Sequence, residues 1–121
     1  MIKEFMYVAL GGALGSASRY GVTILVSILS SSSILATFTA NILGSFLIGI
    51  VMTVFAQEHY FYLLGAIGFC GGFTTFSTFS AQTLQFFQTG QVAYGVSYIF
   101  VSVLLCVLAV LLGLVVGNYR F

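Results

Sequence analysis

The chain has 121 residues, of which 60% are hydrophobic and only 4% carry a charge. A soluble domain has about a quarter charged residues, so these few charges could not cover a surface that faces water. The composition therefore predicts an integral membrane protein, and the net charge of +1, without a basic patch, gives no sign of nucleic-acid binding.

Polar residues divide the sequence into four long apolar segments. We expect the spans at residues 5–29, 34–55, 60–87 and 92–116. Each has at least the roughly 20 residues that a helix needs to cross about 30 Å of hydrocarbon, and none alternates like a strand of a membrane barrel. The sequence predicts an all-α fold: one domain over residues 1–121 with four transmembrane helices, multi-pass in the cell membrane.

Small residues recur at helical spacing in the first two segments. Gly11 and Gly15 are four apart, and Ala40, Gly44 and Gly49 form a similar series in the second segment. Faces of this kind let helices approach closely. They predict tight helix contacts without saying what the contacts are for.

Arg19 and Asn41 are polar side chains inside the first and second segments. Arg19 is the only charge well inside a span, where it costs at least about 2.5 kcal/mol. Arg19 therefore indicates a bound anion or a water-filled cavity, unless its side chain reaches the membrane–water interface from a tilted helix. Asn41 offers an amide donor to an anion or to a neighbouring helix.

The third segment contains G-F-C-G-G-F-T-T-F-S-T-F-S from Gly68 to Ser80. Gly71 and Gly72 provide a backbone that leaves helical geometry cheaply, and the threonines that follow are stiff β-branched residues. We expect the third helix to break near Gly71–Thr75 and to free carbonyls at membrane depth, which are natural cation ligands. The alternative is a continuous helix whose glycines serve close packing.

Aromatic and hydroxyl side chains follow this expected break. Phe76 and Phe79 are three apart and share a helical face, with serine and threonine hydroxyls between them. Because the edge of an aromatic ring is electropositive, a small anion could pass along ring edges and hydroxyl donors. In the fourth segment Tyr98 and Ser102 form a thin polar stripe, with Cys106 one turn on.

The few charges give little information about topology. With four spans, Lys3, Glu4, Glu58, His59 and Arg120 lie on one side of the membrane. The lysine and arginine bias is two against zero, which weakly favours cytoplasmic termini and also permits insertion in both orientations.

Three motifs together give the chain a family resemblance. Gly11–Tyr20, Thr37–Phe46 and Gly68–Ser80 resemble the Fluc fluoride-channel family, also called CrcB proteins. The resemblance covers the whole chain, with the same length, four spans and the motifs in order. The third motif is the most specific, and the other two support it.

The resemblance implies an antiparallel dual-topology dimer with two fluoride pathways and one central Na⁺ ion. By motif, Gly71 and Thr74 would give backbone carbonyls to Na⁺. Phe76 and Phe79 would meet fluoride edge-on, Asn41 would lie in the pathway, and Arg19 would face an aqueous vestibule. The polar lining would include Ser77, Thr78, Tyr98 and Ser102.

One position departs from the family pattern S-T-F-S-x-E, because this chain has Gln82 where glutamate is frequent. An amide keeps hydrogen bonding but loses charge and titration. This puts a carboxylate role at that end of the pathway in doubt, and it leaves a heterodimer with a related subunit open beside the homodimer.

The residues leave other functions to weigh against a passive fluoride exporter. A small four-span drug/proton antiporter needs an acidic residue within a span, whereas Glu4 and Glu58 lie at span ends. A membrane assembly protein would leave Gly68–Ser80 unexplained. An enzyme is not expected, because the single histidine, His59, lies at a loop and no nucleophile–base pair can be drawn.

Overall fold

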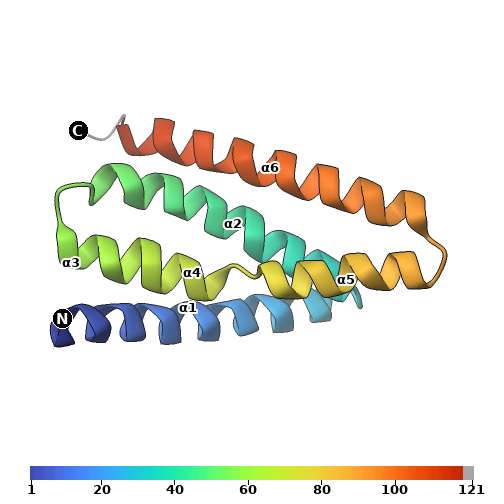
Figure 1. The fold of residues 1–121 in the computed structure, drawn as a ribbon, viewed down its shortest axis with the longest axis horizontal. Coiled ribbons are helices and arrows are strands. Elements are labelled where there is room, and N and C mark those ends of the chain that lie inside the picture. Colours follow the sequence, from blue (N-terminus) through green and yellow to red (C-terminus); the bar gives the residue numbers. More distant parts are fainter. Residues whose placement is uncertain (119–121) are drawn as a thin grey trace.

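The structure, a computed structural model that describes residues 1–118, consists of helices (Figure 1). Three spans are the single helices α1 (Ile2–Leu29), α2 (Ser33–Val54) and α6 (Val92–Asn118). The third span is built from α3 (His59–Tyr62), the π-helix η1 (Leu63–Cys70), α4 (Gly71–Phe73) and α5 (Phe76–Gln88). All four spans are long and apolar enough to cross a membrane, and residues 1–118 contain no strand, so the predicted all-α class is confirmed.

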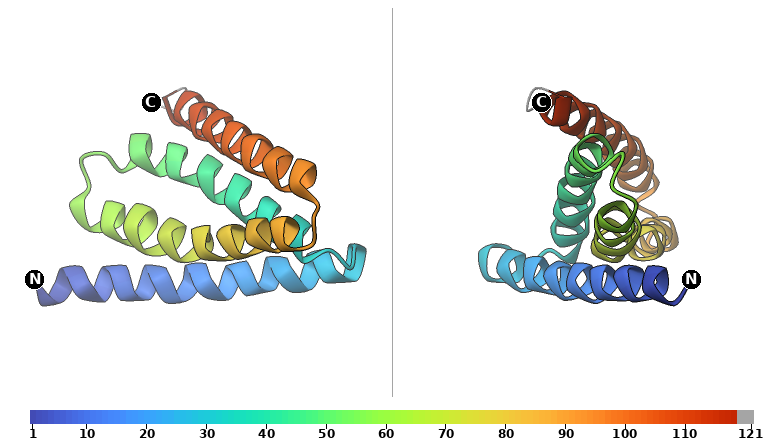
Figure 2. Two further views of the ribbon diagram at one scale, coloured as in Figure 1. Left: turned by 45° about the vertical axis from the view of Figure 1, so that its right-hand side comes forward. Right: turned by 90° about the vertical axis from the view of Figure 1, so that its left-hand side faces the viewer.

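The four spans pack as two pairs, the first span with the third and the second with the fourth. The second half of the third span contacts the other pair and so joins the two. Helix α1 packs along η1 and α4, and α2 packs along α6, while α5 contacts both α2 and α6 (Figures 1 and 2). The beginning of α1 and the end of α6 lie at the same end of the molecule (Figure 1). This is the arrangement that four consecutive crossings require.

Glycines set the distance between α1 and the first half of the third span. A Cβ atom on Gly15 would meet the carbonyl oxygen of Phe69, and one on Gly72 would lie 2.6 Å from the carbonyl oxygen of Gly12. The two backbones therefore touch directly. This is the close approach that small residues permit between membrane helices.

The second small-residue face packs α2 against α6. A Cβ on Gly49 would lie 2.9 Å from Cα of Gly113, and one on Gly44 would meet the Thr74 side chain of the third span. Both predicted faces are thus consumed by contacts inside one subunit. The tight helix contacts that these faces predicted are therefore contacts between helices of the same chain.

The turn after α5 is closed by a glycine. Gly90 has φ 76°, the only positive φ among residues 1–118. The N–H of Gln91 donates to the carbonyl of Phe86 at 2.8 Å, and the N–H of Gly90 donates to that of Phe87 at 3.1 Å. This pair of bonds is the Schellman arrangement, which ends α5 sharply and lets α6 return along it.

The third span is broken, but the break lies at its threonines rather than at its glycines. Gly71 keeps helical angles (φ −63°, ψ −37°), whereas Thr74 and Thr75 are extended, with ψ of 159° and 111°. The break therefore lies inside the predicted range Gly71–Thr75, at its threonine end, while the two glycines stay helical. The glycines serve close packing against α1, and the β-branched threonines take the extended geometry that suits them.

Charged side chains gather at the end of the molecule where α1 begins. Glu4 Oε1 lies 3.1 Å from His59 Nε2, which joins α1 to α3. Lys3 lies at the start of α1, and Glu58 directly precedes α3. Arg120 lies outside the described residues. The pair is exposed, so solvent screens it and it contributes little to stability.

Candidate functional site: the helix break and its cavity

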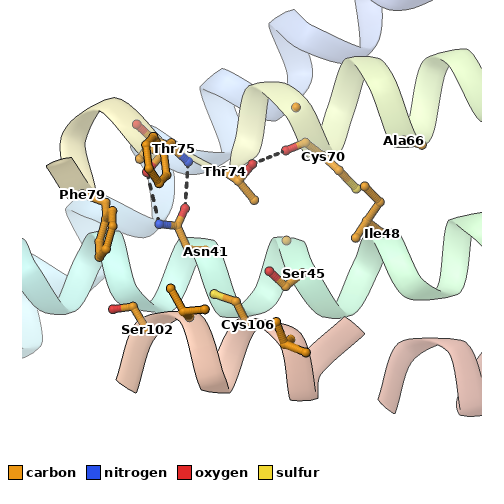
Figure 3. A pocket seen from close by; sticks show the side chains of 15 residues that line it. Asn41, Ser45, Ile48, Ala66, Cys70, Thr74, Thr75, Phe79, Ser102 and Cys106 are labelled. Carbon is orange, nitrogen blue, oxygen red and sulfur yellow. Dashed lines mark hydrogen bonds between the residues drawn. The ribbon is translucent and has the colours of Figure 1, made fainter. Parts of the chain in front are cut away.

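Asn41 of α2 holds the broken segment. Its Oδ1 accepts from the backbone N–H of Thr75 at 2.7 Å, and its Nδ2 donates to the Thr75 carbonyl at 3.1 Å (Figure 3). The side-chain amide thus pairs with the extended residue as a neighbouring strand would. Both backbone groups are satisfied at membrane depth, where an unpaired polar group costs several kcal/mol.

Thr75 also caps the helix that follows. Its Oγ1 accepts from the backbone N–H of Thr78 at 3.2 Å and lies 3.3 Å from Ser77 Oγ and 3.0 Å from Thr78 Oγ1. Sequence reasoning assigned no site role to Thr75. The signal that could have found it is the N-cap preference of threonine, placed directly before the helix of the aromatic motif.

The break leaves the carbonyls of residues 71–74 without the N–H donors that a continuous helix would supply. In a continuous helix the N–H of Thr75 would bond to the Gly71 carbonyl, and here it bonds to Asn41. The N–H of Thr78 would bond to the Thr74 carbonyl, and here it bonds to the Thr75 hydroxyl. Two of these oxygens, on Gly71 and Thr74, belong to the residues that the motif resemblance proposes as sodium ligands, whereas the Gly72 carbonyl accepts from Ser16 Oγ at 3.5 Å.

Arg19 reaches this carbonyl cluster from α1. Its Nη1 donates to the Thr74 carbonyl at 3.4 Å, and the side chain is half-buried. A cation placed beside the end of α4 complements the negative end of that short helix. Around Gly71, by contrast, an added Cβ would meet nothing within 4 Å, so this backbone is open on its outer side.

A cavity of about 400 Å³ opens beside the break, between α2, the third span and α6 (Figure 3). It brings together six of the predicted site residues: Asn41, Gly71, Thr74, Phe76, Phe79 and Ser102. Ser45 and Cys106, which sequence reasoning did not select, also line it. Among the described residues, none with a charged side chain lines this cavity.

Ser102 presents a hydroxyl that lacks a hydrogen-bond partner within residues 1–118. The residue is 6% exposed and lines the cavity with its neighbour Cys106 one turn on (Figure 3). A buried hydroxyl without a partner costs about 1–3 kcal/mol. Its O–H is therefore available to an acceptor that enters the cavity.

The two phenylalanines of the aromatic motif are neighbours with very different surroundings. Their ring centroids are 5.6 Å apart, and Phe79 also contacts Tyr98, at 5.1 Å. Phe79 is 8% exposed, whereas Phe76 is 78% exposed. Phe79 is thus a core ring that also faces the cavity, while Phe76 stands at its open side.

The remaining predicted residues lie near the cavity without lining it. Ser77 and Thr78 are exposed at the start of α5, where they bond to Thr75. Tyr98 lines a separate apolar groove of about 290 Å³. Its hydroxyl donates to Gln82 Oε1 at 2.9 Å, so its only hydroxyl hydrogen is already used inside the subunit.

The two cysteines are free thiols. Cys70 is buried and Cys106 is half-buried. The carbonyl of Cys70 accepts from both the N–H and the Oγ1 of Thr74, at 3.0 and 2.9 Å. Cys70 therefore contributes its backbone, which ends α4, rather than its sulfur.

Comparisons with known proteins give one consistent result. The family model described as "CrcB-like protein, Camphor Resistance (CrcB)" matches residues 6–114. A curated protein of Paracoccus denitrificans, named fluoride-specific ion channel FluC, is 41% identical over 100% of this chain and 99% of its own length. Proteins with the same name from Elusimicrobium minutum and Ruminiclostridium cellulolyticum are 39% and 43% identical, over 93% and 88% of this chain and 92% and 85% of their own lengths. With its four spans, its broken third helix and these full-length matches, the chain belongs to the CrcB family.

Proposed function

We propose that this chain is a fluoride channel that lets the ion leave the cell passively across the cell membrane. The observation that carries the proposal is the uncharged cavity at the helix break, in a chain that matches relatives named fluoride-specific ion channels along nearly their whole length. The four apolar spans support a multi-pass location in the membrane.

The cavity supplies neutral donors for a small, strongly hydrated anion. Removing water from fluoride is costly unless other donors replace it. Such donors are the O–H of Ser102, the second N–H of Asn41 and the electropositive edge of Phe76. Several weak contacts, rather than one fixed positive charge, also let the ion leave again, as conduction requires.

The same lining argues against coupling to protons. An antiporter that exchanges a drug for a proton needs a carboxylate that alternates between the two. The chain has only Glu4 and Glu58, which lie at the ends of spans. No observation favours that second function.

The test is a flux measurement with the full-length protein in liposomes. We expect fluoride to leave the liposomes down its gradient, without proton movement coupled to it, and chloride to leave much more slowly. Liposomes without protein give the background leak. Equal fluoride and chloride fluxes would contradict the selectivity, and a flux that requires a proton gradient would favour the antiporter.

The working unit proposed here is an antiparallel dimer. Gly71 has open space on its outer side, and Phe76 is exposed although it follows the break in the middle of a span, so the cavity lacks a wall on this side. A second copy would supply that wall. The near absence of charge bias between the two ends allows the copies to insert in opposite directions.

Labelling decides the orientation and the composition of this dimer. A single cysteine in an N-terminal tag should react with an impermeant reagent from both sides of the membrane, and the untagged chain controls for Cys70 and Cys106. Labelling from one side alone would contradict dual topology. Purification from cells that express only this chain separates a homodimer, our expectation, from a heterodimer that needs a related subunit.

Sodium fits the oxygens that the break frees. The Gly71 and Thr74 carbonyls lose their helical donors, and neutral oxygens suit a hard cation, whereas the Cys70 thiol would suit softer metals. Two copies would offer four such oxygens. Arg19 bonds to the Thr74 carbonyl, so any cation there shares this oxygen, which has two lone pairs.

A further inference from the structure

Gln82 joins three helices through a complete set of side-chain hydrogen bonds. From α5 its Nε2 donates to the Ser33 carbonyl at 3.1 Å and to Thr37 Oγ1 at 3.0 Å, both on α2. Its Oε1 accepts from the Tyr98 hydroxyl on α6 at 2.9 Å. Both N–H groups and the oxygen of the amide are used.

The chemistry of this junction requires an amide in one orientation. The Ser33 carbonyl can only accept, so it must face the NH₂ group, and the Oε1 must then face the donor on Tyr98. A carboxylate cannot reproduce this set. It has no hydrogen to give, and one of its oxygens would face the Ser33 carbonyl oxygen.

The junction determines where the ring of Tyr98 stands. That ring contacts Phe79 at 5.1 Å between centroids and Phe86 at 6.0 Å, and Phe79 in turn contacts Phe76. Moving the phenol would therefore move the rings that border the cavity. The junction also turns the hydroxyl hydrogen of Tyr98 toward Gln82, which leaves the ring rather than the O–H to face its aromatic neighbours.

We propose that Gln82 is a positioning residue for fluoride conduction, which acts through Tyr98 on the aromatic pair Phe76 and Phe79. The inference rests on the proposed fluoride channel. In place of a titrating group, this position then holds a neutral amide that donates hydrogen bonds to α2 and accepts one from α6. We call this amide and its hydrogen bonds the clamp.

Titratable groups around the clamp are few. Helices α2 and α5 contain none, and α6 carries Tyr94, Tyr98 and Cys106, of which only Tyr98 bonds to Gln82. Fluoride flux through the unmodified protein should therefore be flat from about pH 5.5 to 7.5, because this range lies above the ordinary ionisation of carboxyl groups and below that of thiol and phenol groups.

The test compares Gln82→Glu, Gln82→Met and Tyr98→Phe in full-length protein reconstituted in liposomes. We expect Gln82→Met and Tyr98→Phe each to lower fluoride flux per folded protein about tenfold, the change that the loss of one ordinary hydrogen bond would give. The double variant should be no slower than the slower single variant, because both remove the same clamp. Tyr98→Phe keeps the ring and removes one oxygen atom, so it tests the proposal even where Gln82→Met does not fold.

The pH profile separates positioning from mere packing. While its carboxyl group is protonated, Gln82→Glu retains one donor and one acceptor, so flux should be near the unmodified level at low pH and fall as the carboxyl group ionises. The matched control is Gln85→Glu, the same change on an exposed residue of the same helix, which should keep a flat profile.

Three results would overturn the inference: a flat profile for Gln82→Glu, flux within twofold of normal in Tyr98→Phe, or additive effects in the double variant. Absence of fluoride flux in the unmodified protein would instead refute the channel itself. Protein-free liposomes, measured at each pH, provide the correction for leak of neutral hydrogen fluoride.

Discussion

The third span is built in two ways on the two sides of its break. Before the break, η1 and α4 touch α1 backbone to backbone, because glycines face each other across the contact. After the break, α5 is held to α2 and α6 by side chains, through the hydrogen bonds of Gln82 and the tilted and edge-on contacts of Phe79 and Phe86 with Tyr98.

This difference indicates that the two halves of the third span have different roles. Backbone contact leaves no room for larger side chains, so the first half can change little without losing the fold. Side-chain contacts leave a cavity beside the second half and leave the ring of Phe76 exposed. We therefore expect substitutions before the break to act on folding, and substitutions after it to act on flux.

The largest expected effect is on the glycine contact of α1. Gly15→Leu would drive its side chain into the backbone of Phe69 and Phe73, and should cost about 3 kcal/mol or more, so that little folded protein is recovered. Gly21→Leu is the matched control on the same helix, because a Cβ there meets nothing within 4 Å. Recovery of monodisperse protein after detergent extraction measures both. Equal recovery would refute the close contact.

The next effect tests the residue that joins the two halves. Asn41→Leu leaves the N–H and the carbonyl of Thr75 without partners, and should destabilise the protein by about 2 kcal/mol and abolish most flux. Asn41→Asp keeps the acceptor for the Thr75 N–H, and it can donate to the Thr75 carbonyl while its carboxyl group is protonated, so at low pH its thermal stability should fall between that of Asn41→Leu and that of the unmodified protein. Thermal unfolding and flux are measured on the same samples. An Asn41→Leu protein of normal stability would show that the break does not need the hydrogen bonds of Asn41 with Thr75.

The two rings should separate flux from stability. Phe76→Ile and Phe79→Ile each remove a ring edge from the cavity and should lower fluoride flux about tenfold, as for a lost contact of about 1.4 kcal/mol. Stability should differ, because Phe79 is buried and Phe76 is 78% exposed within the subunit. Phe79→Ile should cost about 1 kcal/mol and Phe76→Ile almost nothing. Near-normal flux in both variants would make these rings simple packing residues.

The smallest effect is expected at Thr74. Thr74→Ser keeps the hydroxyl that bonds to the Cys70 carbonyl and leaves the backbone oxygen in place, so flux should stay within about twofold and stability within about 1 kcal/mol. It loses only a methyl group that contacts Gly44.

Thermal unfolding of the unmodified protein in sodium, and in a large organic cation, tests the proposed metal at the same place. We expect lower stability without sodium, since a bound ion stabilises the state that binds it. No difference between the two cations would contradict a sodium site on the carbonyls of Gly71 and Thr74.

The sequence by itself determined the membrane class, the four spans and the region of the break. These follow from local quantities: the cost of placing charge in hydrocarbon, the length of apolar runs, and the weakness of Gly68–Ser80 as a plain helix. The motif resemblance assigned Asn41, Phe76, Phe79 and Ser102 to a fluoride pathway, and these four residues line one cavity in the structure.

Only the tertiary structure decided which groups meet. Asn41 and Thr75 are 34 residues apart, and Gln82 and Tyr98 are 16 apart, so their hydrogen bonds depend on how the helices pack. The same packing placed the break at the threonine end of the predicted range Gly71–Thr75 and both small-residue faces inside one subunit. Local propensity says which backbone can bend. The bend occurs where a neighbouring helix supplies partners for the backbone groups that the bend exposes.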